Sequence, residues 1–305
     1  MNDYPLVSVI TVNYNQSQAT CDMLESLFNS GYPNMEVIVV DNASPSDQPR
    51  IIKERFPSVC FIQSEVNTGF AGGNNIALKQ AKGEYLYLVN NDTILPEGHI
   101  EQLLKVINSD SSIGVVCPKI KFHHTPDMIQ FAGYTQMSRY TFRNSCFGYG
   151  EKDNGQYDRQ SDSAFAHGAA MFLKRKVIED VGLMNEHYFL YYEELDWSER
   201  IRKAGYRIVY TPETYIYHKE SLSTGKSSPL QTYYLNRNRV LFIRCNTSGM
   251  QKRIGVLYQM CVAIPKNILL LALRGQSQNM KAVMRAWGWN MKNLNRSDAC
   301  TFENI

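Results

Sequence analysis

The chain has 305 residues, 44% of them hydrophobic, so it can bury the core of one large α/β domain or of two small ones. This composition excludes a disordered chain as the starting assumption. The formal net charge of +3 is unevenly distributed, because residues 221–297 contain twelve Lys or Arg and no Asp or Glu. Such segregation indicates that this end of the chain faces something anionic, a membrane surface or nucleic acid, although an ordinary basic helical cap also fits.

The seven cysteines are widely scattered and include no CxxC pair. An odd number of unpatterned cysteines is typical of reduced thiols in a cytosol-like compartment. The sequence starts with Met1, the polar pair Asn2-Asp3 and a strand-like run, rather than with a basic segment and an apolar one. We therefore expect no secretion signal.

Apolar runs alternate with helical patterns through the first half of the chain. The apolar runs predict strands at residues 7–12, 35–40, 60–63, 85–89 and 114–120. The segments between them predict helices at residues 19–29, 48–55, 73–82 and 96–108. This β-α rhythm predicts a largely parallel, doubly wound sheet.

The second half of the chain is less regular. Residues 140–163 are rich in Gly, Asn, Asp, Ser and Gln, which predicts a mobile loop of a length often found in functional lids. Order returns with predicted strands at residues 168–173, 207–210 and 214–218 and with predicted helices at 175–181 and 197–204. Beyond Pro229 the pattern is helical throughout.

The most informative stretch is GEYLYLVNND, residues 83–92, in which a buried strand ends in Asn90, Asn91 and Asp92. Ligands bind at the carboxyl ends of strands in open α/β sheets. Amide and carboxylate oxygens at that edge suit a hard cation such as Mg²⁺ held against a diphosphate. The same three residues also fit a simple turn, because their side chains hydrogen-bond the backbone readily.

Two other strands end in polar residues at the same predicted edge. The first ends at Asn13 and Asn15, and the second ends at Asp41, which can bind a base or a ribose or form an Asx turn. The segment NTGFAGGNN, residues 67–75, places three glycines before a helix, so its backbone N–H groups can face phosphate. It is not the GxGxxG fingerprint, which disfavours a nicotinamide oxidoreductase.

Residues 188–196 combine an aromatic run with three carboxylates, Glu193, Glu194 and Asp196. Mutual repulsion is expected to raise the pKa of one carboxyl and make it a general base. Helix capping also explains one or two acids here, with Asp196 as a fair N-cap. His218 ends an apolar strand, where it can complete a metal site, bind phosphate or be purely structural.

Five motifs in this order resemble the family 2 glycosyltransferases with the GT-A fold, and in particular their rhamnosyltransferase-like branch. The motifs are VSVITVNYN, VVDNAS, NTGFAGGNN, LVNND and YYEELD followed by His218, and the resemblance spans residues 6–220. It implies an α/β, Rossmann-like, mostly parallel sheet with a helical C-terminal extension. It also implies inverting transfer of a sugar from a nucleotide-sugar donor, with dTDP-rhamnose or a UDP-hexose favoured, to a hydroxyl of a glycan or polyprenyl-linked glycan in cell-surface polysaccharide synthesis.

The resemblance assigns roles to residues by their place in the motifs. Glu194 matches the catalytic base, flanked by Glu193 and Asp196, while the implied ligands of Mg²⁺ or Mn²⁺ are Asp92, Asn90 and His218. The implied donor-binding residues are Asn13, Asn15, Asp41, Asn67, Gly69, Gly72, Asn74, Asn91, Gly168 and Ala169. Asn90 replaces an Asp of the family, which removes a negative charge, and Glu194 replaces the more usual Asp, which adds a methylene.

We expect residues 1–225 to form the catalytic domain and residues 226–305 to form a basic helical region. Residues 252–274 are apolar, but Gln259 and residues 265–267 divide them into pieces shorter than the ~20 residues that a membrane span needs. We therefore expect residues 245–296 to lie on an anionic membrane, with the protein cytoplasmic and peripheral on the inner face of the cell membrane. A helical cap or a dimer interface, which would make the protein an oligomer, is the alternative.

Two other classes of function are less consistent with the sequence. A catalytically silent nucleotide-sugar sensor or scaffold would need Asp41 and the glycine-rich turn, but not Glu194, Asp196 and His218 together. Nucleic acid is not an expected partner of the basic tail, because its long aliphatic runs suit lipid or protein better than phosphate.

Overall fold

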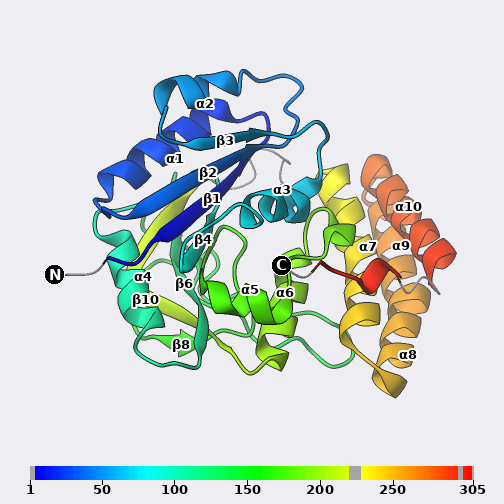
Figure 1. Cartoon of the computed structure of the whole chain (residues 1–305). Coiled ribbons are helices and arrows are strands. Elements are labelled where there is room, and N and C mark those ends of the chain that lie inside the picture. The colour runs from blue at the N-terminus through cyan, green and yellow to red at the C-terminus, as the bar shows by residue number, and fades with distance from the viewer. Residues whose placement is uncertain (1–3, 220–227, 295–297, 304–305) are drawn as a thin grey trace.

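The computed structural model describes residues 4–219, 228–294 and 298–303 and is built around one mixed β-sheet (Figure 1). Its strands lie in the order β3-β2-β1-β4-β9-β6-β10-β5, with β7 beside β6 and β8 beside β10. The strand bounds are β1 Val7–Asn13, β2 Met35–Asp41, β3 Cys60–Gln63, β4 Tyr85–Val89, β5 Thr93–Ile94, β6 Ile113–Phe122, β7 Ile129–Phe131, β8 Ser161–Asp162, β9 Ala170–Lys174 and β10 Arg207–His218.

Most long strands of the sheet run parallel to a neighbour. β1 pairs in parallel with β2 and β4, β2 with β3, and β6 with β10. The central residues Ile10 and Leu88 are fully buried, as expected for continuous apolar strands covered on both faces. β9 is the exception, because it lies antiparallel between β4 and β6. The predicted, mostly parallel sheet is confirmed, and the direction of β9 brings residues 167–169 to the edge where β4 ends.

The helices of the first 219 residues match the predicted segments with shifted ends. They are α1 Ser17–Asn29, α2 Arg50–Arg55, α3 Gly69–Leu78, α4 His99–Ile107, α5 Arg175–Val181, the 3₁₀ turn η1 Glu186–Tyr188 and α6 Glu193–Lys203. α3 begins at Gly69 rather than at residue 73, and α6 begins at Glu193 rather than at residue 197. Both shifts place the glycine-rich and acidic motifs inside the first turns of helices. The predicted strands at 207–210 and 214–218 form one strand, β10, with a register shift between Thr211 and Tyr215.

Residues 140–163, predicted to be a mobile loop, are tied to the sheet by several side-chain contacts. The buried Lys119 ammonium lies 3.2 Å from Asp153 and 2.5 Å from Asp158, and Tyr210 donates its hydroxyl to the Tyr157 carbonyl at 2.9 Å. These contacts fix the segment against β6 and β10, and β8 joins it to the sheet. The polar composition of this segment could not reveal that Lys119 on β6 pairs with its aspartates.

The chain from residue 228 onward is helical, as predicted, and packs through α7 against α6 on one side of the molecule (Figure 1). Its elements are α7 Pro229–Asn246, α8 Gly249–Tyr258, the π-helical segment η2 Gln259–Ala263, α9 Ile264–Leu273, α10 Ser277–Asn293 and the 3₁₀ turn η3 Asp298–Cys300. The boundary predicted at residues 225/226 lies outside the described residues.

The prediction that residues 252–274 break into two pieces is wrong. Helix α8, the π-helical segment and α9 form one continuous helix, Gly249–Leu273, and Pro265 is tolerated in the first turn of α9. This helix has a mean hydropathy of 1.7 over its most apolar window, of which 22% is buried. By length and composition alone it could cross a membrane.

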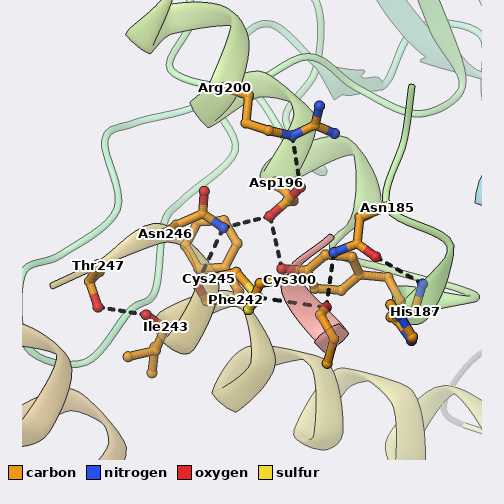
Figure 2. Close-up of a disulfide and its surroundings, with 12 residues drawn as sticks. Asn185, His187, Asp196, Arg200, Phe242, Ile243, Cys245, Asn246, Thr247 and Cys300 are labelled. Atoms are coloured by element: carbon orange, nitrogen blue, oxygen red, sulfur yellow. Dashed lines mark hydrogen bonds and ion pairs between the residues drawn. A yellow bond between two sulfur atoms is a disulfide. The ribbon is translucent and has the colours of Figure 1, made fainter. Parts of the chain in front are cut away.

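A disulfide joins Cys245, at the end of α7, to Cys300 in η3 (Figure 2). The prediction of reduced thiols is therefore wrong for this pair, while Cys21, Cys60 and Cys117 are among the free cysteines. The two partners are 55 residues apart and meet only because the end of the chain returns to α7. Sequence spacing gives no signal for such a pair.

Candidate active site

A cavity of about 400 Å³ opens at the carboxyl edge of the sheet. Its wall is contributed by the end of β4, the start of α3, the loop before β9, the loop before α6, the end of β10 and the start of α7. Among the predicted site residues, those that line it are Asn67, Gly69, Asn74, Asn90, Asn91, Asp92, Gly168, Ala169, Glu193, Glu194 and His218. Segments more than 120 residues apart in the chain therefore meet in one place.

Asp92 and His218 lie side by side in this cavity. His218 Nδ1 is 2.9 Å from Gln130 Oε1, and because an amide oxygen only accepts, Nδ1 carries the proton. The other ring nitrogen, Nε2, lies 3.1 Å from Asp92 Oδ1. Asp92 Oδ1 is buried and has no hydrogen-bond partner among the described residues.

This arrangement fits a divalent cation. An unpaired carboxylate oxygen and an imidazole nitrogen whose other nitrogen is held by an amide are typical metal ligands with outer-shell support. The side chain of Asn90 completes the group, with its Nδ2 placed 3.4 Å from His218 Nε2. The described residues hold no cluster of three His, Cys, Asp or Glu side chains suited to a metal, so a third protein ligand here would be the amide of Asn90.

Glu193, which is buried, and Glu194, which is half-buried, place two carboxyls at the first turn of α6. Each has one buried oxygen, Oε2, with no hydrogen-bond partner among the described residues. Burial raises the pKa of Glu194 to about 7, against the effect of nearby backbone N–H groups that hydrogen-bond the carboxylate. Burial, followed by repulsion from Glu194, raises the pKa of Glu193 well above its ordinary value. The predicted pKa shift is present, but loss of water contributes more to it than repulsion does.

The loop before these carboxyls has an unusual backbone. Phe189, Tyr191 and Tyr192 have positive φ angles of 65°, 66° and 79°, a region that bulky side chains rarely adopt. The side-chain amide of Asn238 on α7 donates to the carbonyls of residues 188, 190 and 191 at 3.0, 2.8 and 2.7 Å. Arg237 donates to the carbonyls of residues 187 and 188. Side chains of helix α7 therefore hold the strained loop in place through its backbone carbonyls.

Gly69 connects the glycine-rich turn to the same loop. Its φ is +73°, and a Cβ at this position would lie 2.0 Å from the carbonyl oxygen of Phe189. The next residue, Phe70, donates its N–H to that oxygen at 2.7 Å. Only glycine allows the backbone of α3 to approach the loop before α6 so closely.

Five predicted residues lie outside the cavity wall, namely Asn13, Asn15, Asp41, Gly72 and Asp196. Asp41 is fully buried and accepts hydrogen bonds from Asn13, Ser44 and Gln63, so its oxygens are already satisfied. Contact between this carboxylate and a pyrimidine would require one of these partners to move. Gly72 instead allows close packing, because a Cβ there would lie 2.5 Å from Thr68.

Asp196 is a structural tether rather than part of the cavity. Its carboxylate accepts hydrogen bonds from Tyr188 at 3.0 Å and Asn246 at 2.7 Å, and it pairs with Arg200 at 3.2 Å (Figure 2). These three partners connect the aromatic loop, α7 and α6 beside the disulfide. Asp196, which was predicted to flank the base, therefore lies outside the cavity wall, and its carboxylate is bound by these partners.

His167 lines the cavity directly before the predicted donor-binding residues Gly168 and Ala169. Its Nδ1 accepts the Ala169 N–H at 3.1 Å, and its ring lies parallel to Tyr134 with centroids 5.9 Å apart. Burial and the neighbouring His218 lower the pKa of His167 to about 3, so the ring is neutral and Nε2 carries the proton. The small and apolar residues that follow His167 in the sequence gave no indication that its ring provides an N–H donor. Other cavity residues that sequence analysis missed are Asn42, Gln130, Tyr134 and Gln231.

Comparison with known proteins gives a consistent result. The family model described as Glycosyl transferase family 2 matches residues 8–182. The N-acetylglucosaminyl-diphospho-decaprenol L-rhamnosyltransferase of Mycobacterium tuberculosis is 22% identical, over 80% of this chain and 86% of the relative. The low-salt glycan biosynthesis hexosyltransferase Agl10 of Haloferax volcanii is 25% identical, over 77% of this chain and 74% of the relative.

Solved structures show the same fold. The mannosyltransferase PcManGT from Pyrobaculum calidifontis, in complex with GDP-Man and Mn²⁺, aligns with a TM-score of 0.59 and 17% identity over 97% of this chain and 89% of its own. S. aureus TarS 1–349 in complex with UDP-GlcNAc aligns with a TM-score of 0.58 and 19% identity over 92% and 81%. Since the family model covers more than half of the chain, the protein belongs to glycosyl transferase family 2 and is a glycosyltransferase with the GT-A fold.

Proposed function

We propose that the protein transfers a sugar from a nucleotide-sugar donor to a hydroxyl of a glycan or lipid-linked glycan, with inversion at the anomeric carbon. The observation that carries this proposal is that one cavity is lined by the Asp92–His218 pair and by the Glu193–Glu194 pair. The first pair suits the diphosphate of a donor, and the second provides a proton acceptor for an incoming hydroxyl.

In the proposed reaction, Glu194 takes the proton of the acceptor hydroxyl while the oxygen of that hydroxyl forms a bond to the anomeric carbon. The bond between that carbon and the diphosphate oxygen breaks, and the nucleoside diphosphate leaves with the electron pair. A pKa of about 7 allows Glu194 to be ionised before the reaction and protonated after it. One positioned carboxylate base is sufficient for a single displacement with inversion.

We propose that Asp92, His218 and Asn90 hold Mg²⁺ or Mn²⁺. When bound, such an ion neutralises the negative charge that develops on the leaving diphosphate. Support comes from the buried Asp92 Oδ1, which has no hydrogen-bond partner among the described residues, from its position 3.1 Å from His218 Nε2, and from the Mn²⁺ present in the PcManGT complex. Asn90 brings no charge to the group, so we expect weaker retention of the ion in the absence of donor.

We propose that the donor lies along the glycine-rich turn, with Asn67, Gly69 and Asn74 on one side and Gly168 and Ala169 on the other. All five residues line the cavity. The favoured donors are dTDP-rhamnose, by likeness to the mycobacterial rhamnosyltransferase, and a UDP-hexose, by likeness to TarS in complex with UDP-GlcNAc.

The acceptor is proposed to be a polyprenyl-linked glycan of cell-surface polysaccharide synthesis. The name of the mycobacterial relative specifies a decaprenol-linked acceptor for that enzyme. We accordingly propose that the protein works in the cytoplasm at the inner face of the cell membrane, with residues 1–225 binding the donor and catalysing transfer. Residues 226–305 would then act as the helical region that meets the membrane.

Two measurements test the proposed function. A panel of nucleotide sugars, screened for thermal stabilisation with and without Mn²⁺, identifies the donor. The Glu194→Gln variant should then lose turnover by about 10²- to 10⁴-fold and keep its affinity for that donor. Glu199→Gln is the control, because Glu199 lies on α6 outside the cavity wall and pairs with Arg202. A Glu194→Gln enzyme that retains most of its turnover would remove Glu194 from the role of base, and donor binding without transfer by the native protein would favour a sensor.

A further inference from the structure

The long helix Gly249–Leu273 has two apolar faces. One face is buried and includes Gly255, Met260 and Ile264. The other consists of exposed residues that recur at helical spacing, namely Met250, Ile254, Leu257, Val262, Leu269 and Leu273. Leu257 is 64% exposed and Leu273 is 76% exposed. Packing inside the protein explains the first face only, so the second, here called the outer face, requires another explanation.

Helix α10 extends the outer face. Its buried residues Ala282, Val283 and Ala286 face the other helices, while Met284, Trp287 and Met291 are exposed. These three positions are spaced by three and four residues and therefore lie on one side of α10. Figure 1 shows α8, α9 and α10 at the outer limit of the molecule, beyond α7 and away from the sheet.

The surroundings of the outer face are positively charged. Exposed basic residues on the same helices include Arg253, Lys266 and Arg274, followed by Lys281 and Arg285 on α10. Residues 228–294 contain no Asp or Glu. A broad apolar stripe with Lys and Arg beside it is the pattern of helices that lie in a membrane interface and attract anionic headgroups.

We propose that the outer face docks on a bilayer containing anionic phospholipid, with α8–α9 and α10 lying in the interface and not crossing the membrane. The apolar side chains enter the boundary between headgroups and acyl chains, and the basic side chains contact lipid phosphates. This inference deepens the proposed function, in which residues 226–305 meet the membrane, by naming the surface and the lipid; lipid binding by this surface can fail while sugar transfer persists.

The buried face explains why the helix lies on the membrane. Gln259 donates its side-chain amide to the Thr141 carbonyl at 2.9 Å, and Asn267 donates to Asn236 at 3.1 Å. A Cβ on Gly255 would lie 2.5 Å from Phe142, so the helix packs closely against the rest of the protein. Crossing the bilayer would break these contacts and leave polar groups without partners in hydrocarbon.

The charge of the surface also disfavours a second copy of the chain as its partner. Pairing about a two-fold axis places the same surface on both sides, which would bring like charges together. Nucleic acid would match the charge but would leave the apolar stripe unused. Anionic lipid matches both the positive charge and the apolar stripe of the surface.

The test uses point variants of the full chain, because deletion of residues 245–305 would damage the catalytic part. Cys300 is joined to Cys245, and Asn185 donates to the Ala299 carbonyl at 3.1 Å. The end of the chain also accepts the Leu183 N–H at the Glu303 carbonyl. A truncated protein could therefore fail for reasons unrelated to lipid.

Flotation is measured with phosphatidylcholine vesicles that contain, or lack, about a third of phosphatidylglycerol, an anionic lipid. The native protein should float with the anionic vesicles. A Leu257→Gln/Leu269→Gln/Leu273→Gln variant should lose about tenfold or more in partition coefficient. A Lys266→Gln/Arg274→Gln variant should lose about fivefold per charge on anionic vesicles and change little on neutral ones.

The matched control is Val66→Gln/Tyr140→Gln, which removes two large apolar side chains that are 64% and 65% exposed elsewhere on the surface. It should float like the native protein. Thermal melts and donor-induced stabilisation of each variant show that the fold and the donor site are intact, which separates this test from that of the proposed function.

Any of four results would overturn the inference. The native protein would stay in the soluble fraction with anionic vesicles, or the triple leucine variant would float unchanged. Light scattering would show a dimer that the triple variant dissociates while no lipid binding occurs. Resistance of the bound protein to extraction at alkaline pH would show that the helix crosses the membrane, against an interfacial position.

Discussion

The side-chain amide of Asn238 lies 2.7 Å from the carbonyl oxygen of Tyr191, and this contact ties α7 to the backbone two residues before Glu193. The same amide reaches two more carbonyls of the loop. Three carbonyls that converge on one donor hold the loop in a conformation that its aromatic residues disfavour. The helical region is therefore part of the active-site structure, even though it lies beyond the segment that the family model matches.

Replacing Asn238 by Ala should reduce turnover more than donor affinity. The loop would lose the donor that its three carbonyls share and would relax from its positive φ angles. This relaxation would displace the carboxyls of Glu193 and Glu194. Loss of one buried amide leaves carbonyls unsatisfied at a cost of about 1–3 kcal/mol. Initial rates at varied donor concentration, with hydrogen exchange of residues 187–192, measure both effects. Asn293→Ala on α10 is the control, because that amide bonds only its own helix; equal effects of the two variants would contradict the prediction.

Activity should rise with pH through about 7. Burial raises the pKa of Glu194 to about 7, and only the ionised form accepts a proton. The rising limb of kcat/KM against pH should disappear in Glu194→Gln and persist in Glu199→Gln. A native enzyme with full activity at pH 5 would contradict the assignment.

The same shift has an opposite effect on stability. The folded chain holds the Glu194 proton more tightly than the unfolded chain, whose ordinary pKa is 4.5. The stabilisation is complete below that value and is lost as pH rises through about 7. Unfolding by urea at a series of pH values should show a decline over this window that is smaller in Glu194→Gln. A decline of equal size in the two proteins would assign it to other groups.

Replacing Gln130 by Leu should weaken metal binding by about 10- to 100-fold. The amide oxygen lies 2.9 Å from His218 Nδ1 and so holds the ring with Nε2 beside Asp92. Titration of activity with Mn²⁺ at saturating donor measures the effect, and Gln156→Leu in the exposed segment 154–160 is the control. Asn90→Asp should act in the opposite direction, because it adds a negative charge at the ion. Unchanged Mn²⁺ dependence in both Gln130→Leu and Asn90→Asp would exclude this group as the metal site.

Replacing Gly69 by Ala should destabilise the protein and reduce turnover. The new Cβ would meet the Phe189 carbonyl, and the left-handed backbone adds about 1–2 kcal/mol. Gly288→Ala is the matched control, because nothing lies within 4 Å of a Cβ there and the position is helical. It should stabilise the protein by up to about 1 kcal/mol. Thermal melts of both variants check the prediction, and a neutral Gly69→Ala would show that the two loops move apart freely.

His167→Phe should raise the KM for donor while leaving the stacked ring in place. The variant removes the Nε2 N–H of a cavity-lining residue and keeps a ring of similar size beside Tyr134. Binding of the nucleotide sugar and of the free nucleoside diphosphate, measured side by side, shows whether the N–H contacts the sugar or the phosphate. His124→Phe, at an exposed position, is the control. Unchanged affinity for both ligands would make His167 a packing residue.

Local pattern was sufficient for most of the fold. Continuous apolar runs such as Tyr85–Val89 are fully buried strands, and their polar ends do meet at one edge. The direction of β9 was not predictable, because a strand buried on both faces has the same composition in either direction. The anchoring of residues 140–163 depends on Lys119, which is far away in the sequence.

Prediction of the site was most successful where position in a motif decides contact. Asn90, Asp92 and His218 come together because each ends a strand at the same edge. Position in a motif was less informative about the direction in which a side chain on a helix points. Asp196 follows Glu194 by two residues on a helix, and this spacing rotates it to the side of Tyr188 and Asn246. The support from Asn238 arises from a contact across 47 residues that no local pattern contains.

The bond between Cys245 and Cys300 encloses the helices α8, α9 and α10 in a covalent ring. Arg274 and Gly275 are exposed in the turn between α9 and α10, so we expect trypsin to cut there. A cut at that turn would leave both fragments attached to each other, so the nicked enzyme would migrate as one band on a nonreducing gel. Two bands would appear only after addition of a thiol.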